Sequence, residues 1–358
     1  MRSFHRVRST MGGSRMVLPK IVSLFSGAGG LDLGFHDAGF DLAFAVDSSE
    51  WAIKTHQRNF KNAKSVAADL IELQPVGVLA HLAQILKDGE PIGVIGGPPC
   101  QGFSRSNPAA LPTDPRNELP ILYLEIVEEL QKKYDVQFVL FENVLGIRDL
   151  KHEAAFQGIL SKLRKLGLTE KVDEYCALDF GVPQNRRRVI ISAFKSPASA
   201  KAFAPVTAPR QNLDARTAIG DLPAPAFFDR NLSPEDIPHH PNHWTTRPVS
   251  KRFDDPDNAM NGSRSFRRLA WDKPSPTVAY GHREIHIHPD GRRRLSIYEA
   301  MRFQGFPHEF VLEGPLSAQV EQVSNAVPPP LAYALADATI RAMDQSTRVS
   351  KVRDGLVA

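Results

Sequence analysis

The chain has 358 residues, and 42% of them are hydrophobic, so it is long and apolar enough to form two folded domains. No apolar run reaches the ~18 residues of a membrane helix, and the basic residues 1–20 lack the apolar centre of a secretory signal. The two cysteines exclude a disulfide framework and suit a reducing cytoplasm, while a net charge of +4 is compatible with a nucleic-acid partner.

A glycine-rich turn is predicted near the start of the chain. The apolar run 21–25 is followed at once by Ser26-Gly27-Ala28-Gly29-Gly30 and an amphipathic segment, which predicts a strand, a turn and a helix. Glycines let a ligand approach the backbone, and a helix start offers N–H donors. Because Asp32 stands where a dinucleotide fingerprint needs glycine, we expect a nucleoside-containing ligand without a pyrophosphate. A tight turn that binds nothing is the alternative.

Two acidic residues follow the next two predicted strands. Asp47 comes directly after the apolar run 42–46, and Asp69 comes directly after Val66-Ala67-Ala68. A carboxylate at the end of the second strand commonly binds ribose hydroxyls, and one at the end of the third could accept from an exocyclic amine. Either acid alone is more often solvated or helix-capping. Their order after the glycine turn indicates a nucleoside site.

Cys100 is predicted to lie on a stiff turn at the end of a fourth strand. The apolar run 92–95 precedes Gly96-Gly97-Pro98-Pro99-Cys100, and in an open α/β sheet ligands bind at the carboxyl ends of strands. Two prolines restrict the turn, which favours a mounted nucleophile. A buried, inert cysteine is the alternative, because free cysteines are among the most buried residues. Residues 101–118 are rich in Pro, Ser and Asn and are predicted to form a lid.

The next candidates are one acid and a group of arginines. A predicted helix over 119–130 leads to a strand over 136–141 that ends in Glu142-Asn143-Val144. Partial burial would favour the protonated form of Glu142, so that it can donate a proton. After a helix over 153–166 and a strand over 172–177, strand alternation places Arg186 and Arg188 on one face and Arg187 on the other. A solvated basic edge is the alternative for these arginines.

The composition changes at about residue 196. Residues 196–294 contain 15 Lys/Arg and 11 Asp/Glu with poor helical periodicity, which predicts a separate, loop-rich domain whose arginines could contact phosphates. Its histidines lack a metal-site spacing, so we expect no metal. Order returns with a helix over 295–306, where Ser296 and Glu299 fit a capping box, and the run 331–343 predicts a closing helix.

Eight motifs in linear order resemble those of the cytosine-5 DNA methyltransferases. Together with their flanking elements they extend over residues 21–342, nearly the whole chain. The matching motifs are Phe25–Gly30, Asp47, Asp69, Pro98–Gln101, Glu142–Val144, Gln184–Arg188, Glu299–Pro307 and Asn325–Pro328.

The resemblance implies an α/β fold: a Rossmann-like, S-adenosylmethionine-dependent methyltransferase domain with a smaller, irregular target-recognition domain. We expect a monomer whose partner is double-stranded DNA, and we expect no membrane association. The helix after Asn325 would fold back onto the first domain. The implied divisions are a basic disordered tail (1–18), the catalytic domain (19–195), the target-recognition domain (196–290), the return to the catalytic domain (291–345) and a tail (346–358).

The resemblance also implies residue roles in site-specific methyl transfer to carbon 5 of a flipped-out cytosine. Cys100 would attack carbon 6 of the base and Glu142 would act on ring nitrogen 3. Arg186 would bind the carbonyl oxygen and orient Glu142, with help from Arg188. The implied cofactor-binding residues are Phe25, Ser26, Gly27, Ala28, Gly29, Gly30, Asp47, Ser48, Asp69, Leu70, Pro99 and Asn325. The implied DNA-binding residues are Gln101, Ser104, Arg264, Arg267, Arg268 and Thr277.

Two other functions are weighed against this one. A tRNA cytosine-5 methyltransferase shares the fold, but its Cys-Phe-Thr signature is absent here, and the insert over 196–294 favours DNA. A non-catalytic DNA-binding relic would have lost Cys100 or Glu142, and both are present. The resemblance leaves open a cognate restriction endonuclease that acts on the same site, or methylation without such a partner.

Overall fold

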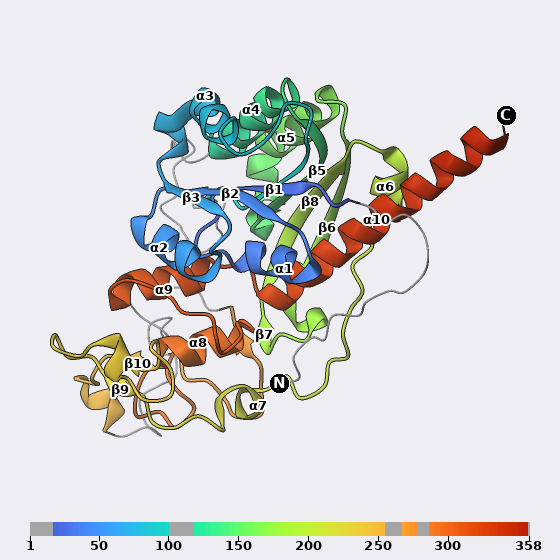
Figure 1. Cartoon of the computed structure of the whole chain (residues 1–358). Helices are drawn as coiled ribbons and strands as arrows, with labels where there is room; N and C mark the ends of the chain where they lie inside the picture. Colours follow the sequence, from blue (N-terminus) through green and yellow to red (C-terminus); the bar gives the residue numbers. More distant parts are fainter. Residues whose placement is uncertain (1–16, 100–117, 255–266, 278–285, 357–358) are drawn as a thin grey trace.

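A computed structural model describes residues 17–99, 118–254, 267–277 and 286–356. Its centre is a seven-stranded sheet with the strand order β3-β2-β1-β4-β5-β8-β6 (Figure 1). Most of the predicted basic tail and the predicted lid lie outside the described residues. The strands of the sheet are β1 (Lys20–Leu24), β2 (Leu42–Asp47), β3 (Lys64–Ala67), β4 (Pro91–Gly96), β5 (Asp135–Asn143), β6 (Thr169–Cys176) and β8 (Arg187–Phe194).

The sheet is mostly parallel. The pairs from β3 to β5 run parallel, and β8 enters antiparallel between β5 and β6. The apolar runs of β1, β4 and β5 are buried on both faces, as strands covered by helices on two sides must be. This architecture confirms the predicted Rossmann-like α/β fold.

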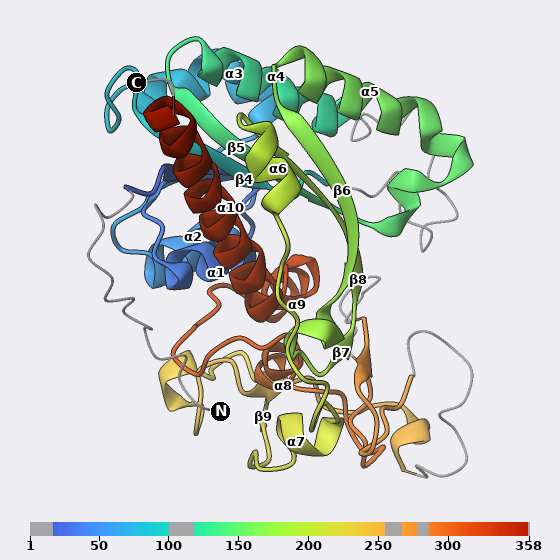
Figure 2. The ribbon, with the colours of Figure 1, turned by 90° about the vertical axis from the view of Figure 1, so that its right-hand side faces the viewer.

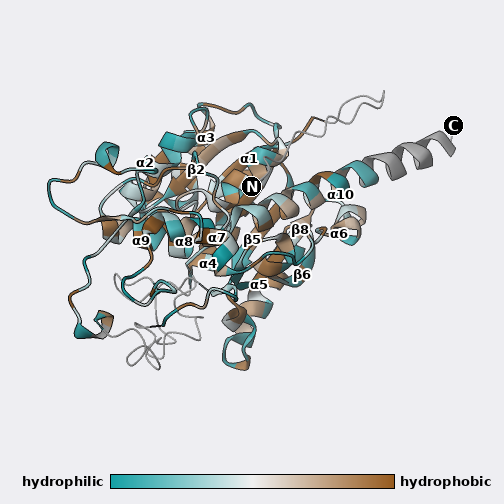
Figure 3. Cartoon of the chain, turned by 90° about the horizontal axis from the view of Figure 1, so that it is seen from below, coloured by the Kyte–Doolittle hydropathy of each residue, from teal (hydrophilic) through white to brown (hydrophobic). Residues whose placement is uncertain are grey.

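Helices cover both faces of the sheet (Figure 2). In Figure 3 the coloured part of the α10 helix shows both apolar and polar residues, in keeping with one face packed on the protein. One layer contains α3 (Leu70–Leu82), α4 (Leu119–Gln131) and α5 (Glu153–Lys165), and the other contains α1 (Gly30–Ala38), α6 (Pro197–Ala202) and α10 (Pro329–Leu356).

The C-terminal helix α10 packs on α1. A Cβ atom added at Gly34 of α1 would lie only 2.3 Å from the backbone nitrogen of Tyr333 in α10. Leu331 and Leu335 are fully buried in the same interface region. The missing side chain of Gly34 therefore lets the two backbones approach closely, so that residues from the two ends of the chain share one core.

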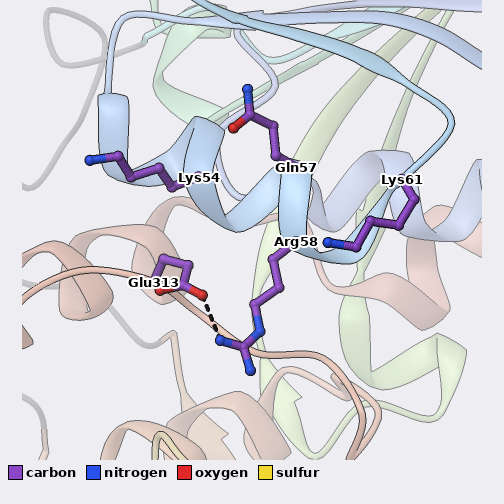
Figure 4. Close-up of a pocket in the computed structure, with 5 residues that line it drawn as sticks. All are labelled: Lys54, Gln57, Arg58, Lys61 and Glu313. Carbon is purple, nitrogen blue, oxygen red and sulfur yellow. Dashed lines mark hydrogen bonds and ion pairs between the residues drawn. The ribbon is translucent and has the colours of Figure 1, made fainter. Parts of the chain in front are cut away.

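Helix α2 (Glu50–Asn59) is joined to the segment before α9 (Leu316–Asn325). The Asn59 side chain donates to the Val311 carbonyl at 2.9 Å and accepts from its N–H at 3.1 Å. Arg58 pairs with Glu313 at 2.6 Å on the wall of an open surface hollow (Figure 4). That hollow is lined by Lys54, Gln57, Arg58, Lys61 and Glu313.

The residues between α6 and α8 form a second, irregular lobe, below the sheet in Figure 1. Buried polar contacts tie it to the first lobe: Asn242 exchanges two 2.8 Å bonds with Leu312, and the Trp244 indole donates to Gln319 at 2.8 Å. The regular elements from α6 to α8 are α7 (Ala215–Ile219), β9 (Ala226–Phe227), η5 (Pro234–Asp236), β10 (Trp244–Thr245), η6 (Lys251–Phe253), β11 (Ser275–Pro276) and α8 (Ile297–Phe303). The short elements that precede α6 are η2 (Leu145–Arg148), η3 (Leu150–His152), η4 (Ala177–Phe180) and β7 (Gln184–Asn185).

The α8 helix begins with the predicted capping box. Ser296 accepts from the Glu299 N–H at 3.0 Å, and Glu299 accepts from the Ser296 N–H at 2.7 Å. The same buried carboxylate accepts two bonds from Arg293, at 2.8 and 2.7 Å. This bidentate pair fixes the chain where it returns from the second lobe. None of the described helices is long and apolar enough to cross a membrane.

Candidate active site

The glycine turn after β1 is left-handed in three places. The φ angles are +55° at Phe25, +54° at Gly27 and +89° at Gly29. The Gly27 N–H donates to the Asp47 carboxylate at 2.9 Å, and a Cβ added at Gly27 would meet nothing within 4 Å. The turn is therefore anchored by Asp47 and open at Gly27, which leaves room for a ligand against the backbone.

Two carboxylates lie at the ends of the neighbouring strands β2 and β3. Asp47 accepts a second bond, from the Ser49 N–H at 2.9 Å. Burial raises the pKa of the Asp47 carboxyl, and the two backbone N–H bonds oppose this shift. Asp69 is exposed and caps α3 by accepting from the Ile71 N–H at 2.8 Å. Each carboxylate keeps acceptor capacity for a ligand, because an ionised carboxylate offers about four lone-pair sites.

The motif after α9 packs against the start of α1. A Cβ added at Gly30 would lie 2.4 Å from the Val327 carbonyl oxygen. This contact brings the exposed Asn325 to the glycine-turn side of the sheet. An open turn, two acceptor carboxylates at successive strand ends and a polar side chain nearby fit a nucleoside-containing cofactor such as S-adenosylmethionine.

Glu142 lies at the end of β5, beside the turn that leads to Cys100. Only 8% of Glu142 is exposed. A Cβ added at Gly97 would lie 3.0 Å from the Glu142 carboxylate, so the backbone after β4 passes directly against this acid. Cys100 itself lies outside the described residues.

Arg188 is the ion-pair partner of Glu142. Its Nε lies 2.7 Å from the Glu142 carboxylate, and the two side chains are 13% and 11% exposed. The antiparallel register explains the contact: Glu142 faces Ile190 across β5 and β8, and Arg188, two residues away, is its diagonal neighbour on the same face. The pair places a positive charge beside the acid in a largely dry site.

Arg186 is buried next to the C-terminal end of α9. It is 1% exposed and donates to the carbonyls of Ser324 at 2.9 Å and Asn325 at 3.3 Å. Arg186 lies between β7 and β8 rather than within one continuous strand, so it does not follow the alternation that would place it beside Glu142. In the described residues Arg188 is the ion-pair partner of Glu142, and Arg186 bonds to the C-terminal end of α9.

The end of the second lobe joins the arginine motif. Strand β11 pairs with β7, with Ser275 opposite Gln184, and the Thr277 hydroxyl donates to the Asn185 carbonyl at 2.9 Å. This arrangement brings a predicted DNA-binding residue into contact with the strand that precedes Arg186.

A family model described as C-5 cytosine-specific DNA methylase matches residues 19–341. The chain belongs to this family. It is 33% identical over 342 residues to the type II methyltransferase M.MthTI of Methanothermobacter thermautotrophicus, a match that covers 88% of this chain and 95% of that protein. It is 32% identical over 337 residues to M1.HphI of Haemophilus parahaemolyticus, with 89% and 86% covered.

A solved structure also matches nearly the whole chain. An E. coli prophage-encoded protein described as a DNA modification methyltransferase superposes with a TM-score of 0.69 at 25% identity, over 91% of this chain and 100% of that one. Entamoeba histolytica EhMeth, at 16% identity and a TM-score of 0.61, shares the fold. The protein is therefore a C-5 cytosine DNA methyltransferase, and its curated relatives are type II enzymes of restriction-modification systems.

The remaining predicted residues of the methyltransferase are distributed around this site. Arg268 donates to the Pro289 carbonyl at 2.8 Å, and Arg267 is exposed. The described residues contain no group of side chains that could hold a metal ion. Ser26, Ala28, Gly30 and Leu70 are buried, Phe25 and Pro99 are half-buried, and Ser48 is exposed. The predicted residues outside the described ranges are Cys100, Gln101, Ser104 and Arg264.

Two polar residues near the site were not predicted. Gln304 is fully buried and its amide donates to the Val323 carbonyl, next to the carbonyls that Arg186 holds. His56 is fully buried beneath the glycine turn and lies 3.2 Å from Asp32. A single histidine or glutamine on an apolar helix face is usually a satisfied core residue, so the local pattern does not mark either one.

Proposed function

We propose that this methyltransferase modifies carbon 5 of a cytosine that is flipped out of duplex DNA, within one short sequence, through a transient bond between Cys100 and carbon 6. The observation that carries the proposal is the Glu142–Arg188 pair, which lies against the backbone of the turn that leads to Cys100. An acid and a cation thus lie at the neighbouring ends of β5 and β8, against the backbone after β4 that leads to the candidate nucleophile.

The residue types fit the chemistry of a poor carbon nucleophile. Addition of the Cys100 thiolate to carbon 6 makes carbon 5 enamine-like and able to accept a methyl group. In its protonated form Glu142 would donate to ring nitrogen 3, which offsets the charge that develops there. Loss of the carbon 5 proton then expels the thiolate. An unperturbed thiol is only a few per cent ionised at neutral pH, so the arginine motif is proposed to favour the thiolate.

The proposed cofactor site is the open glycine turn. Phe25 would pack on the adenine, Asp47 would accept from the ribose hydroxyls and Asp69 from the adenine amine. Pro99 and Asn325 would lie at the methionine end. S-adenosylmethionine supplies the electrophilic methyl group. Asp47 occupies the position where the family usually has Glu, and its side chain is one methylene shorter. Its carboxylate also accepts from the Gly27 and Ser49 N–H groups, so it would reach the ribose from a fixed position.

The proposed DNA site uses both lobes. A stacked cytosine cannot reach Glu142, and extrusion of a base costs a few kcal/mol. Gln101 and Ser104 of segment 101–118 would close over the DNA, and Arg264, Arg267, Arg268 and Thr277 of the recognition domain would contact it. We propose that the enzyme acts as a monomer, with a restriction endonuclease of the same specificity as its functional partner.

The proposal is tested with labelled S-adenosylmethionine, duplex DNA and bisulfite mapping, with a tRNA substrate in parallel. We expect methylated cytosines in one short DNA motif and a covalent adduct with a 5-fluorocytosine duplex. Cys100→Ser should nearly abolish turnover while cofactor binding persists. Cys176→Ser is the matched control, because Cys176 is a buried free cysteine of β6. Near-normal methylation by Cys100→Ser would refute the mechanism.

A further inference from the structure

A buried chain of hydrogen bonds runs beneath the glycine turn. The His56 ring in α2 lies 3.2 Å through Nε2 from the Asp32 carboxylate of α1, and 2.8 Å through Nδ1 from the Ser65 hydroxyl of β3. Asp32 and His56 are both fully buried. The chain therefore connects the elements that carry the three parts of the proposed cofactor site, because β3 leads to Asp69 and α2 follows Asp47.

The direction of one of these bonds follows from the groups involved. An ionised carboxylate can only accept, so Nε2 carries the proton that it donates to Asp32. Asp32 lies in the first turn of α1, where a negative charge is favoured by the helix dipole. Removal of the His56 side chain would therefore leave the buried Asp32 carboxylate without the hydrogen bond from Nε2.

The same histidine ring supports the glycine turn by contact. A Cβ added at Gly29 would lie 3.0 Å from Cδ2 of His56 and 2.5 Å from Cε2 of Phe60. The two rings pack together with centroids 4.4 Å apart. Gly27, two residues earlier, is open. At Gly29 the turn therefore packs on the rings of His56 and Phe60, and at Gly27 it has open space for a ligand.

We propose that His56 is a positioning residue for the cofactor: through Asp32 and Ser65 it holds the glycine turn in the conformation that binds S-adenosylmethionine. The inference rests on the proposed function, because it takes that ligand from it. His56 is not in the glycine turn or at a strand end. It acts through the backbone that it supports, so its loss should affect cofactor affinity rather than the chemical step.

The test compares His56→Phe with His56→Gln in the full-length protein. Phenylalanine keeps a ring on Gly29 but loses both hydrogen bonds, whereas the glutamine amide can still donate to Asp32. For His56→Phe we expect the calorimetric Kd for S-adenosylmethionine and the KM for that substrate to rise about tenfold. The kcat at saturating cofactor and the KM for DNA should stay within about twofold. His56→Gln should recover most of the affinity.

Thr55→Val is the matched control, on the adjacent residue of the same helix. Thr55 is also fully buried, but its hydroxyl bonds to Gln322 and to the Glu313 N–H, away from the glycine turn. This variant should lower the Tm and leave the cofactor Kd unchanged. Equal loss of cofactor affinity in Thr55→Val and His56→Phe would overturn the proposal, since general destabilisation would then explain both.

The remaining outcomes are also decisive. A wild-type Kd in His56→Phe overturns the inference. If His56→Phe does not fold, Ser65→Ala decides: a two- to threefold weaker Kd supports the proposal, and wild-type affinity contradicts it. Failure of the wild-type protein to bind S-adenosylmethionine would instead refute the proposed function.

Discussion

Replacement of Arg188 by methionine tests the ion pair at the centre of the site. Methionine keeps much of the length of the side chain but removes the guanidinium that lies 2.7 Å from Glu142. The carboxylate then has no described cation beside it and only 8% exposure to water. The folded state should therefore be destabilised, because a buried charge without a partner loses hydration without compensation.

The size of the effect follows from the burial of the pair. Breaking a buried ion pair costs about 3–5 kcal/mol, and the 13% and 11% exposure of the two side chains favours the lower end, about 3 kcal/mol. For a domain of about 150–250 residues, a loss of about 3 kcal/mol corresponds to a fall in Tm of roughly 6–12 °C. The double variant Glu142→Gln/Arg188→Met should regain at least half of the loss, because it contains no unpaired charge.

Thermal unfolding followed by circular dichroism measures these changes without reference to activity. Arg187→Met is the matched control, since Arg187 pairs with Glu174 at the surface, with side chains 57% and 34% exposed. Its loss should have little effect on stability, because exposed ion pairs contribute little. The reasoning fails if Arg188→Met melts like the wild type, or if the double variant is as unstable as Arg188→Met alone.

Three further predictions use other parts of the structure. Burial raises the pKa of Asp47, so S-adenosylmethionine affinity measured by calorimetry should fall as pH decreases toward that pKa, and Asp47→Asn should bind more weakly with no such dependence. Burial lowers the pKa of His240 to about 4, so below pH 6.5 the unfolded chain is protonated first at this residue. His240 should therefore account for about 2 kcal/mol of the stability lost between pH 8 and pH 5 in urea unfolding, and a His240→Gln variant that loses as much as the wild type would contradict this. Gly34→Ala should cost about 3 kcal/mol in thermal unfolding because its Cβ would lie 2.3 Å from Tyr333, whereas Gly158→Ala, with open space on α5, should not destabilise; equal Tm values would refute this packing argument.

The strands were predicted best where both of their faces are buried. The run 92–95 lies inside β4 and the run 136–141 lies inside β5, because a covered parallel strand is continuously apolar. Strand β6 begins at Thr169, earlier than the apolar run 172–177, because it is an edge strand with many half-buried polar residues. Helix α3 contains Pro75 and α9 has few apolar residues, so neither has the pattern of an ordinary amphipathic helix.

The site depends on contacts that no local pattern contains. Asp47, Asp69 and Glu142 could be placed at strand ends, because strand ends follow from apolar runs. The roles of Arg186 and Arg188 could not be separated, since that requires the β5–β8 register and the break between β7 and β8. The bonds from Arg186 to Ser324 and Asn325 join segments that are distant in sequence, and only the fold brings them together.

The close crossing of α1 and α10 has a consequence for biosynthesis. Helix α1 leaves the ribosome long before the partner that covers it, because α10 begins only at Pro329. Until then, one side of the nascent sheet exposes apolar residues that chaperones and proteases recognise. Polypeptides terminated before Pro329 should therefore be degraded or aggregate, and separate expression of the missing helix should rescue them.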